Sequence, residues 1–171
     1  MTAVKAAPAL RRENAAHRPQ RKDMKDISTG MQEHHKSCDE QFAIAEDAAG
    51  RGDWAACEAA FARFRDGLER HFGTEEEIIF PAFEQRSGMF GGPTQVMRME
   101  HTQMRGLIAQ MDSALKARDA ASFCGAADTQ LVLMQQHNMK EENILYPMCD
   151  QTLGADTALL EEVARSLEAT A

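Results

Sequence analysis

The segment HFGTEEEIIFP, residues 71–81, recurs as HNMKEENILYP at residues 137–147. Both copies follow the pattern His-x-x-x-Glu-Glu-x-Ile-aliphatic-aromatic-Pro, and they begin 66 residues apart (137 minus 71). Histidine and glutamate are common metal ligands, whereas the packing of a helix requires only an apolar stripe. The repetition therefore indicates two related helical units that supply ligands to one shared metal site.

Two further histidines follow the same offset, because His101 lies 66 residues after His35. Residues i and i+4 of an α-helix project from the same face, so each His-x-x-x-Glu pair points in one direction. A single histidine in an apolar stripe is more often a core residue, but four histidines and two glutamates in a repeat favour a metal site. The predicted metal ligands are His35, His71, Glu75, His101, His137 and Glu141.

Apolar residues at spacings of three and four predict four long helices. The first covers residues 28–49, and Asp53 is a candidate N-cap for the second, which reaches at least Pro81. The glycine-rich segment 87–93 separates the two halves, and Pro93 suits the first position of the third helix.

Residues 118–122 turn the chain into the fourth helix, and Asp156 is a candidate cap for a short terminal helix. The apolar stripe of the fourth helix is predicted at Leu133, His137, Glu141, Ile144 and Met148. Short connections make each pair of helices an antiparallel hairpin. We therefore predict an all-α fold, an up-down four-helix bundle with a short C-terminal helix, over residues 27–171.

Residues 1–26 carry seven Lys or Arg against three Asp or Glu and show no sustained period, which predicts a disordered basic tail. The rest of the chain has a net charge of −12, since the whole chain carries −8 and the tail +4. This acidic body argues against a nucleic-acid partner. No segment reaches the roughly 20 apolar residues of a membrane span. With no secretory signal and no closely spaced cysteines, we expect a cytoplasmic protein with reduced thiols.

Imidazole nitrogens with a few carboxylate oxygens suit iron, and also manganese, zinc or copper. One glutamate from each hairpin could bridge a pair of ions, and two histidines could complete the ligands of each ion. Such a set has fewer anionic ligands than that of ferritin-like oxidases, which use more glutamates. We expect it to favour the binding or sensing of a diatomic molecule over hard oxidation chemistry.

The chain resembles the hemerythrin-like (HHE) cation-binding family over about residues 27–150. The resemblance rests on Glu33-His34-His35, on Glu100-His101 and on the two His-x-x-x-Glu-Glu segments. It implies an up-down bundle around a non-haem di-iron centre, with two oxo- or hydroxo-bridged iron ions. It also implies that the four histidines are terminal ligands and that Glu75 and Glu141 are bridges.

Two departures from the oxygen-carrying members stand out. Those members have a second histidine one turn after the ligand of the third helix, where this chain has Arg105, and an aspartate at i+5 in place of Glu141. The pattern resembles more closely the bacterial stress-response and iron-centre-repair type. We expect Arg105 to form an ion pair, with Asp39 as its candidate partner. His34, about 100° from the ligand stripe, is expected at the surface, with a supporting role beside the ligands as the alternative.

The sequence thus predicts a non-haem di-iron protein that binds or senses oxygen, nitric oxide or peroxide. A di-iron enzyme (a peroxidase, an oxidase or a nitric-oxide consumer) and an iron donor for the repair of iron–sulphur centres are the alternatives. The expected partner is a small diatomic ligand or peroxide, without nucleic acid or membrane, and no protein partner is identified.

Overall fold

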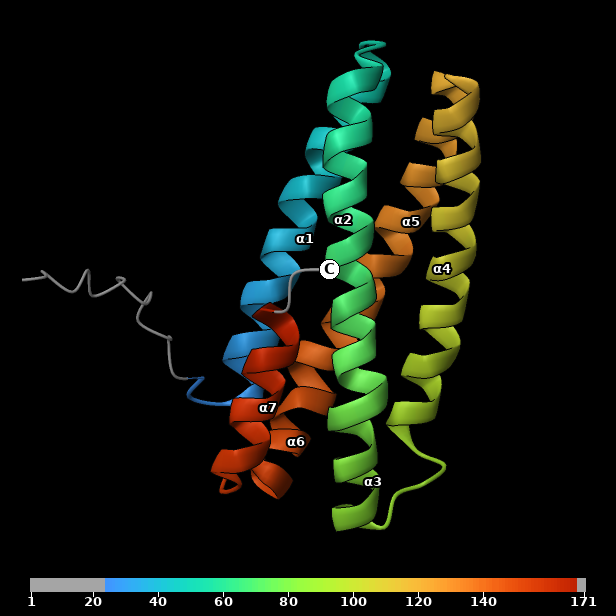
Figure 1. Cartoon of the computed structure of the whole chain (residues 1–171). Helices are drawn as coiled ribbons and strands as arrows, with labels where there is room; N and C mark the ends of the chain where they lie inside the picture. Colours follow the sequence, from blue (N-terminus) through green and yellow to red (C-terminus); the bar gives the residue numbers. More distant parts are fainter. Residues whose placement is uncertain (1–23, 169–171) are drawn as a thin grey trace, which may run out of the picture.

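The computed structural model describes residues 24–168, and its long helices form two antiparallel hairpins (Figure 1). In the first, α1 (Ile27–Gly50) packs on α2 (Trp54–Thr74), and in the second, α4 (Pro93–Ala117) packs on α5 (Ala120–Lys140). The helix α2 continues through η1 (Glu75–Ile79) into α3 (Phe80–Ser87), and α5 continues through η2 (Glu141–Leu145) into α6 (Tyr146–Leu153). The short α7 (Thr157–Glu168) follows. The predicted all-α bundle with a short C-terminal helix is confirmed.

Aspartates cap the helices where the chain turns. The Asp53 carboxylate accepts a hydrogen bond from the backbone N–H of Ala56, and the Asp156 carboxylate accepts one from that of Leu159. Both predicted caps are therefore confirmed, since such bonds satisfy amides that lack an intrahelical partner. The predicted basic tail, residues 1–26, lies outside the described residues except for its last three.

The segments η1 and η2 are π-helical turns at equivalent positions of the two copies. The Phe80 N–H bonds to the Glu75 carbonyl, and the Tyr146 N–H bonds to the Glu141 carbonyl, five residues back in each case. A proline follows each turn, and proline removes a helical donor and crowds the carbonyl four residues earlier. The wider turn before each proline lets the helix continue past it.

Each π turn shifts the buried face of its helix by one residue. Ile144, which the spacing placed in the apolar stripe, is 55% exposed, whereas Leu145 is 1% exposed. That part of the predicted stripe was wrong, because a π turn adds a residue to the local repeat. His137, which precedes the second turn, and Glu141, which is its first residue, keep the predicted phase and are buried.

The interior contains two apolar clusters with a polar layer between them. One cluster lies toward the hairpin loops and includes Phe42, Phe64 and Met104. The other includes Met31 and the residues that follow the π turns. On each of the four long helices, the predicted ligands fall between residues of the two clusters. The polar layer is therefore enclosed by hydrocarbon on both sides along the bundle axis.

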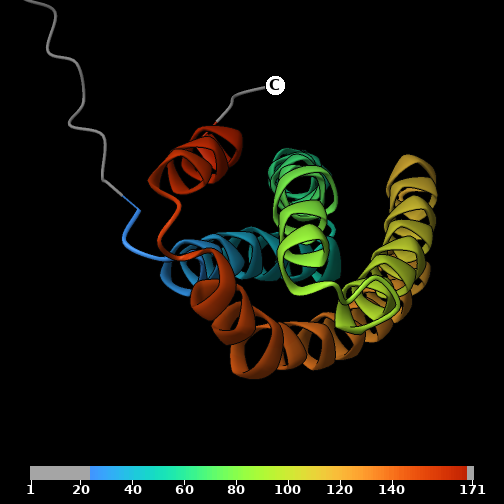
Figure 2. The same cartoon turned by 90° about the horizontal axis from the view of Figure 1, so that it is seen from below.

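The helix α7 covers the first hairpin, as the view along the bundle shows (Figure 2). Its Leu160 and Val163 belong to the second apolar cluster, and its Ser166 hydroxyl lies 2.7 Å from that of Thr74 on α2. Among residues 24–168, no helix combines the length and the apolar character that crossing a membrane requires.

The Asp150 side chain on α6 links the C-terminal part of the chain to the first turn of α1. It accepts a hydrogen bond of 2.8 Å from the Ile27 N–H and another from the Ser28 hydroxyl, at the start of α1. We expect Asp150→Ala to lower the free energy of unfolding by about 1–2 kcal/mol, because the substitution leaves these donors without their acceptor. Urea unfolding followed by circular dichroism measures this change. A variant as stable as the parent would show that water replaces the carboxylate fully.

Candidate metal centre

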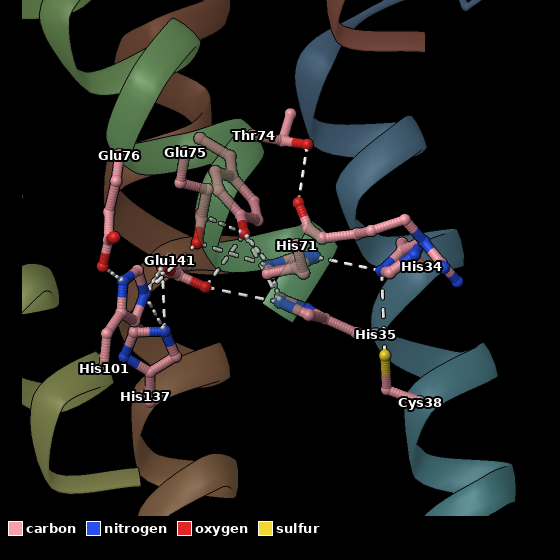
Figure 3. A network of polar contacts seen from close by, with 12 residues as sticks. His34, His35, Cys38, His71, Thr74, Glu75, Glu76, His101, His137 and Glu141 are labelled. Atoms are coloured by element: carbon pink, nitrogen blue, oxygen red, sulfur yellow. Dashed lines mark hydrogen bonds and ion pairs between the residues drawn. The ribbon is translucent and has the colours of Figure 1, made fainter. Parts of the chain in front are cut away.

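The structure brings all six predicted ligands together in the polar layer (Figure 3). Their side chains come from four helical rods, and each residue is at most 4% exposed. Buried polar groups in such number require partners, because an unpaired one costs stability. The contributors are His35 on α1, His71 on α2, Glu75 at the start of η1, His101 on α4, His137 on α5 and Glu141 at the start of η2.

The histidines form two pairs, one in each hairpin. The Nε2 atoms of His35 and His71 are 3.0 Å apart, and those of His101 and His137 are 3.2 Å apart. The same geometry thus occurs twice, as the 66-residue repeat predicts.

Each glutamate contacts one histidine of each pair. Glu75 Oε2 lies 3.5 Å from His71 Nε2 and 3.2 Å from His101 Nε2. Glu141 Oε2 lies 3.3 Å from His35 Nε2, and its Oε1 lies 3.0 Å from His137 Nε2. Both carboxylates therefore span the space between the two histidine pairs, as bridging ligands would.

The outward-facing Nδ1 atom of each histidine also has a partner. The carboxylates of Glu142, Glu76 and Glu100 lie 2.7, 2.7 and 2.9 Å from Nδ1 of His35, His101 and His137. A carboxylate that accepts the Nδ1–H proton fixes the tautomer and leaves the Nε2 lone pair free to bind a metal. Glu76 and Glu142 thus each reach a histidine of a neighbouring helix.

His34 is the partner of the fourth histidine. Its Nδ1 lies 3.2 Å from His71 Nδ1, and the two rings stack. The predicted surface position was wrong, because His34 is only partly exposed and contacts a predicted ligand. In the 66-residue repeat His34 corresponds to Glu100, which has the same role beside His137.

Cationic side chains hold two of the outer carboxylates. Arg105 Nη1 lies 2.8 Å from Glu76 Oε1, and Lys140 forms an ion pair with Glu100. Arg105 also pairs with Glu69, so the predicted pairing with Asp39 was wrong. The guanidinium of Arg105 contacts Glu69 on α2 and Glu76 on η1, and not Asp39 on α1. Although burial raises the pKa of Glu76, the hydrogen bonds from Arg105 and His101 outweigh it and lower that pKa.

Tyr146 is a member of the centre that sequence reasoning missed. Its hydroxyl lies 2.8 Å from Glu75 Oε1 and 2.9 Å from Glu141 Oε2, and it donates its proton to one of them. The equivalent residue of the first copy is Phe80, whose ring stacks on His101. The exchange of phenylalanine for tyrosine at the aromatic position of the repeat was the available signal.

We expect Tyr146→Phe to retain the packing of the ring but to destabilise the metal-free protein by about 1–3 kcal/mol. The substitution removes a donor from two buried carboxyl groups, and a buried acceptor without a donor carries that cost. Chemical unfolding in the presence of a chelator measures the difference. Phe80→Tyr provides the matched comparison in the other half, and equal stability of Tyr146→Phe and the parent would contradict the role assigned to the hydroxyl.

The pKa values of Glu75 and His35 are raised, which favours protons on these two groups, whereas the pKa of His71 is lowered. Burial and the neighbouring Glu141 raise the pKa of Glu75, and burial together with His35 lowers the pKa of His71. Burial lowers the pKa of His35, but its hydrogen bonds to Glu141 and Glu142 outweigh that effect and raise the pKa to about 8. Metal ions would displace such protons, since ligands bind in their deprotonated forms.

The donor atoms fit a pair of cations. Two groups of donor atoms lie within 4.8 Å of one another among the described residues, and Glu141 belongs to both. One group is Glu75, His101, His137 and Glu141, and the other is His35, His71 and Glu141. Glu75 Oε2 and Glu141 Oε1 lie close to histidine Nε2 atoms, but both oxygens are buried and neither accepts a hydrogen bond from any residue that the structure describes. Unpaired buried carboxylate oxygens are costly, and coordination of a cation satisfies them.

Cys38 lies close to this centre but belongs to neither donor group of the described residues. Its Sγ is 3.7 Å from His34 Nδ1, and burial raises the pKa of the thiol to about 12. The thiol therefore stays protonated at neutral pH and is a poor nucleophile.

Comparison with known proteins agrees with this geometry. Searches among curated proteins and among solved structures found no match. The family model for the hemerythrin HHE cation binding domain matches residues 26–149, a span that contains all six donors. The chain therefore belongs to the hemerythrin HHE cation-binding domain family, and its buried His/Glu cluster offers donor atoms that could hold a metal ion.

Proposed function

We propose that this chain is a non-haem di-iron protein that binds or senses oxygen, nitric oxide or peroxide. The observation that carries the proposal is that each of the two buried carboxylates contacts one histidine of each pair. Glu75 and Glu141 would bridge two ions, one held by His35 and His71 and the other by His101 and His137. Iron would supply reversible one-electron chemistry and positions open to a small ligand.

The residues around the donors support binding of a small neutral ligand. The apolar clusters on both sides exclude bulk water, which strengthens the electrostatic interactions inside. The outer carboxylates fix the orientation of three imidazoles, so the site is pre-organised. The Tyr146 hydroxyl, which donates to Glu75 or Glu141, lies in this enclosed space.

Metal analysis combined with spectroscopy tests the proposal. Protein purified after growth in iron-replete medium should contain about two iron ions per chain, as a two-metal site requires. Its near-ultraviolet charge-transfer absorption should change when dioxygen or nitric oxide is added to the reduced protein. Iron content near zero, or zinc in its place, would contradict the proposal.

Turnover of peroxide or nitric oxide at the same centre is the second candidate. The Tyr146 hydroxyl favours it, because reduction of peroxide to water consumes protons and this hydroxyl is a donor inside the site. Steady-state consumption of peroxide by the protein in the presence of an added electron donor that re-reduces the iron, diminished in Tyr146→Phe, would identify an enzyme. Binding without turnover would identify a carrier or sensor.

Repair of iron–sulphur centres is the remaining alternative. It requires that iron leave the site for another protein, so transfer from the loaded chain to an apo-cluster protein would identify it. Retention of the iron in that experiment would favour binding or sensing.

A further inference from the structure

A polar recess of about 400 Å³ lies between α1 and α2, beside the metal centre. Two arginines, Arg63 and Arg70, line it together with the Gln41 amide. Its inner wall contains His34 and the Cys38 thiol. Figure 3 shows His34 between Cys38 on one side and His71 on the other. One side chain thus separates the recess from a predicted metal ligand.

The second hairpin has an equivalent recess with a different lining. The 66-residue offset carries Arg63 to Thr129 and Arg70 to Gln136, and both of those residues line a recess between α4 and α5. Three further pairs of lining residues are related by the same offset: Gln41 and Leu107, Asp66 and Val132, and Gly67 and Leu133. The donors of the metal centre are thus repeated in both halves, whereas the two cationic side chains are present in one recess alone.

The charges of Arg63 and Arg70 are available for a ligand. Within residues 24–168 neither side chain forms an ion pair, and Arg70 Nε is buried without a hydrogen-bond partner. The remaining acid of the recess, Asp66, is engaged by Arg65 at 3.0 Å. Two arginines in one recess of a chain with a net charge of −8 are therefore not neutralised by their own surroundings.

The Gln41 amide adds a second unsatisfied group. Its Oε1 atom is buried and has no hydrogen-bond partner among the described residues. The oxygen and nitrogen of an amide exchange places when the group is turned, so the same position can present an N–H donor. Buried polar atoms without partners in a recess indicate a missing ligand or water.

We propose that this recess binds a small planar oxyanion, such as nitrate, nitrite or the carboxylate of a small organic acid. The planar fork of an arginine matches the two oxygens of such an anion. The anion lies against Arg70, whose charge also acts on His34 and on Cys38. Because His34 contacts His71, a bound anion changes the environment of the metal centre. The effect on the metal centre rests on the proposed function, whereas the binding of the anion in the recess does not.

Calorimetric titration of the iron-loaded protein with sodium nitrate tests the proposal, at an ionic strength set by a bulky organic sulfonate. We expect one nitrate site per chain. The double variant Arg63→Gln/Arg70→Gln should weaken binding at least tenfold, with an unchanged circular dichroism spectrum. The matched control is Arg51→Gln/Arg86→Gln, which removes the same charge from two arginines that are paired with Asp47 and Asp156. This control should bind nitrate as the parent does.

The titration is repeated with acetate and with chelator-treated protein. Tighter nitrate binding identifies an inorganic oxyanion as the ligand, and tighter acetate binding identifies an organic acid. Binding that persists after chelation and is lost in the Arg63/Arg70 variant supports the recess, even if the chain holds no iron. Absence of binding, equal losses in the control, or binding that requires metal and is insensitive to the two arginines would overturn the proposal.

Discussion

Glu141→Ala is expected to reduce the metal content from about two ions per chain to almost none. Glu141 is the donor that both groups share, and its two oxygens lie near His35 and His137. His101→Ala, by contrast, removes a donor from one group and leaves the His35, His71 and Glu141 group complete. That variant should retain about one ion. Elemental analysis of purified protein distinguishes the two results.

The control for this comparison is Glu77→Ala, two residues beyond Glu75. Its side chain is exposed and belongs to neither donor group, so the variant should keep the parent's metal content. Loss of Glu141 also relieves the metal-free protein of a buried charge, so its helical content should be preserved. A Glu141→Ala protein that is folded and still holds two ions would exclude Glu141 as a bridging ligand.

Removal of the metal ions is expected to lower the melting temperature by about 15–30 °C. An ion at about a thousand times its dissociation constant adds about 4 kcal/mol to the free energy of unfolding, so two ions add about 8 kcal/mol. For a domain of this size each kcal/mol corresponds to about 2–4 °C. The physical reason is that the cations would bind donors that only the folded chain brings together, among them the completely buried Glu75 and Glu141.

Thermal scans with and without a strong chelator measure this shift. The Glu141→Ala variant is the control, because a protein without the shared bridge has little metal to lose and should melt at the same temperature in both buffers. A parent protein whose melting temperature does not respond to chelation would show that the cluster is stable without cations.

The fold and the six donors were accessible from the sequence because they depend on simple periodic geometry. His71 and Glu75 are separated by one helical turn, and so are His137 and Glu141, so their common direction follows from the helix itself. The assignment of these residues as metal ligands remains a prediction that the substitutions above test. The Asp53 and Asp156 caps were predictable for a similar reason, since a cap is a local interaction.

The remaining features depend on tertiary contacts or on an irregular turn. A π turn was not predictable from apolar spacing, and it placed Leu145 in the core in place of Ile144. Arg105 forms ion pairs with Glu69 and Glu76. A long side chain can reach several neighbours, and the sequence offset alone does not select among them. His34 was misplaced because its burial depends on how closely α1 approaches α2 at His71.

Each of the two glutamates contacts a histidine of the other hairpin, so the stability of one hairpin depends on the other. Glu75 of the first hairpin reaches His101 of the second, and Glu141 of the second reaches His35 of the first. A pair of cations held in this way would act as an internal cross-link between two halves, in addition to side-chain packing and to polar contacts such as the ion pair of Arg105 with Glu69. Amide hydrogen exchange should then be slow in both hairpins at once when the ions are present. Once the ions are removed, the backbone amides of each hairpin should exchange at a rate that does not depend on the other hairpin.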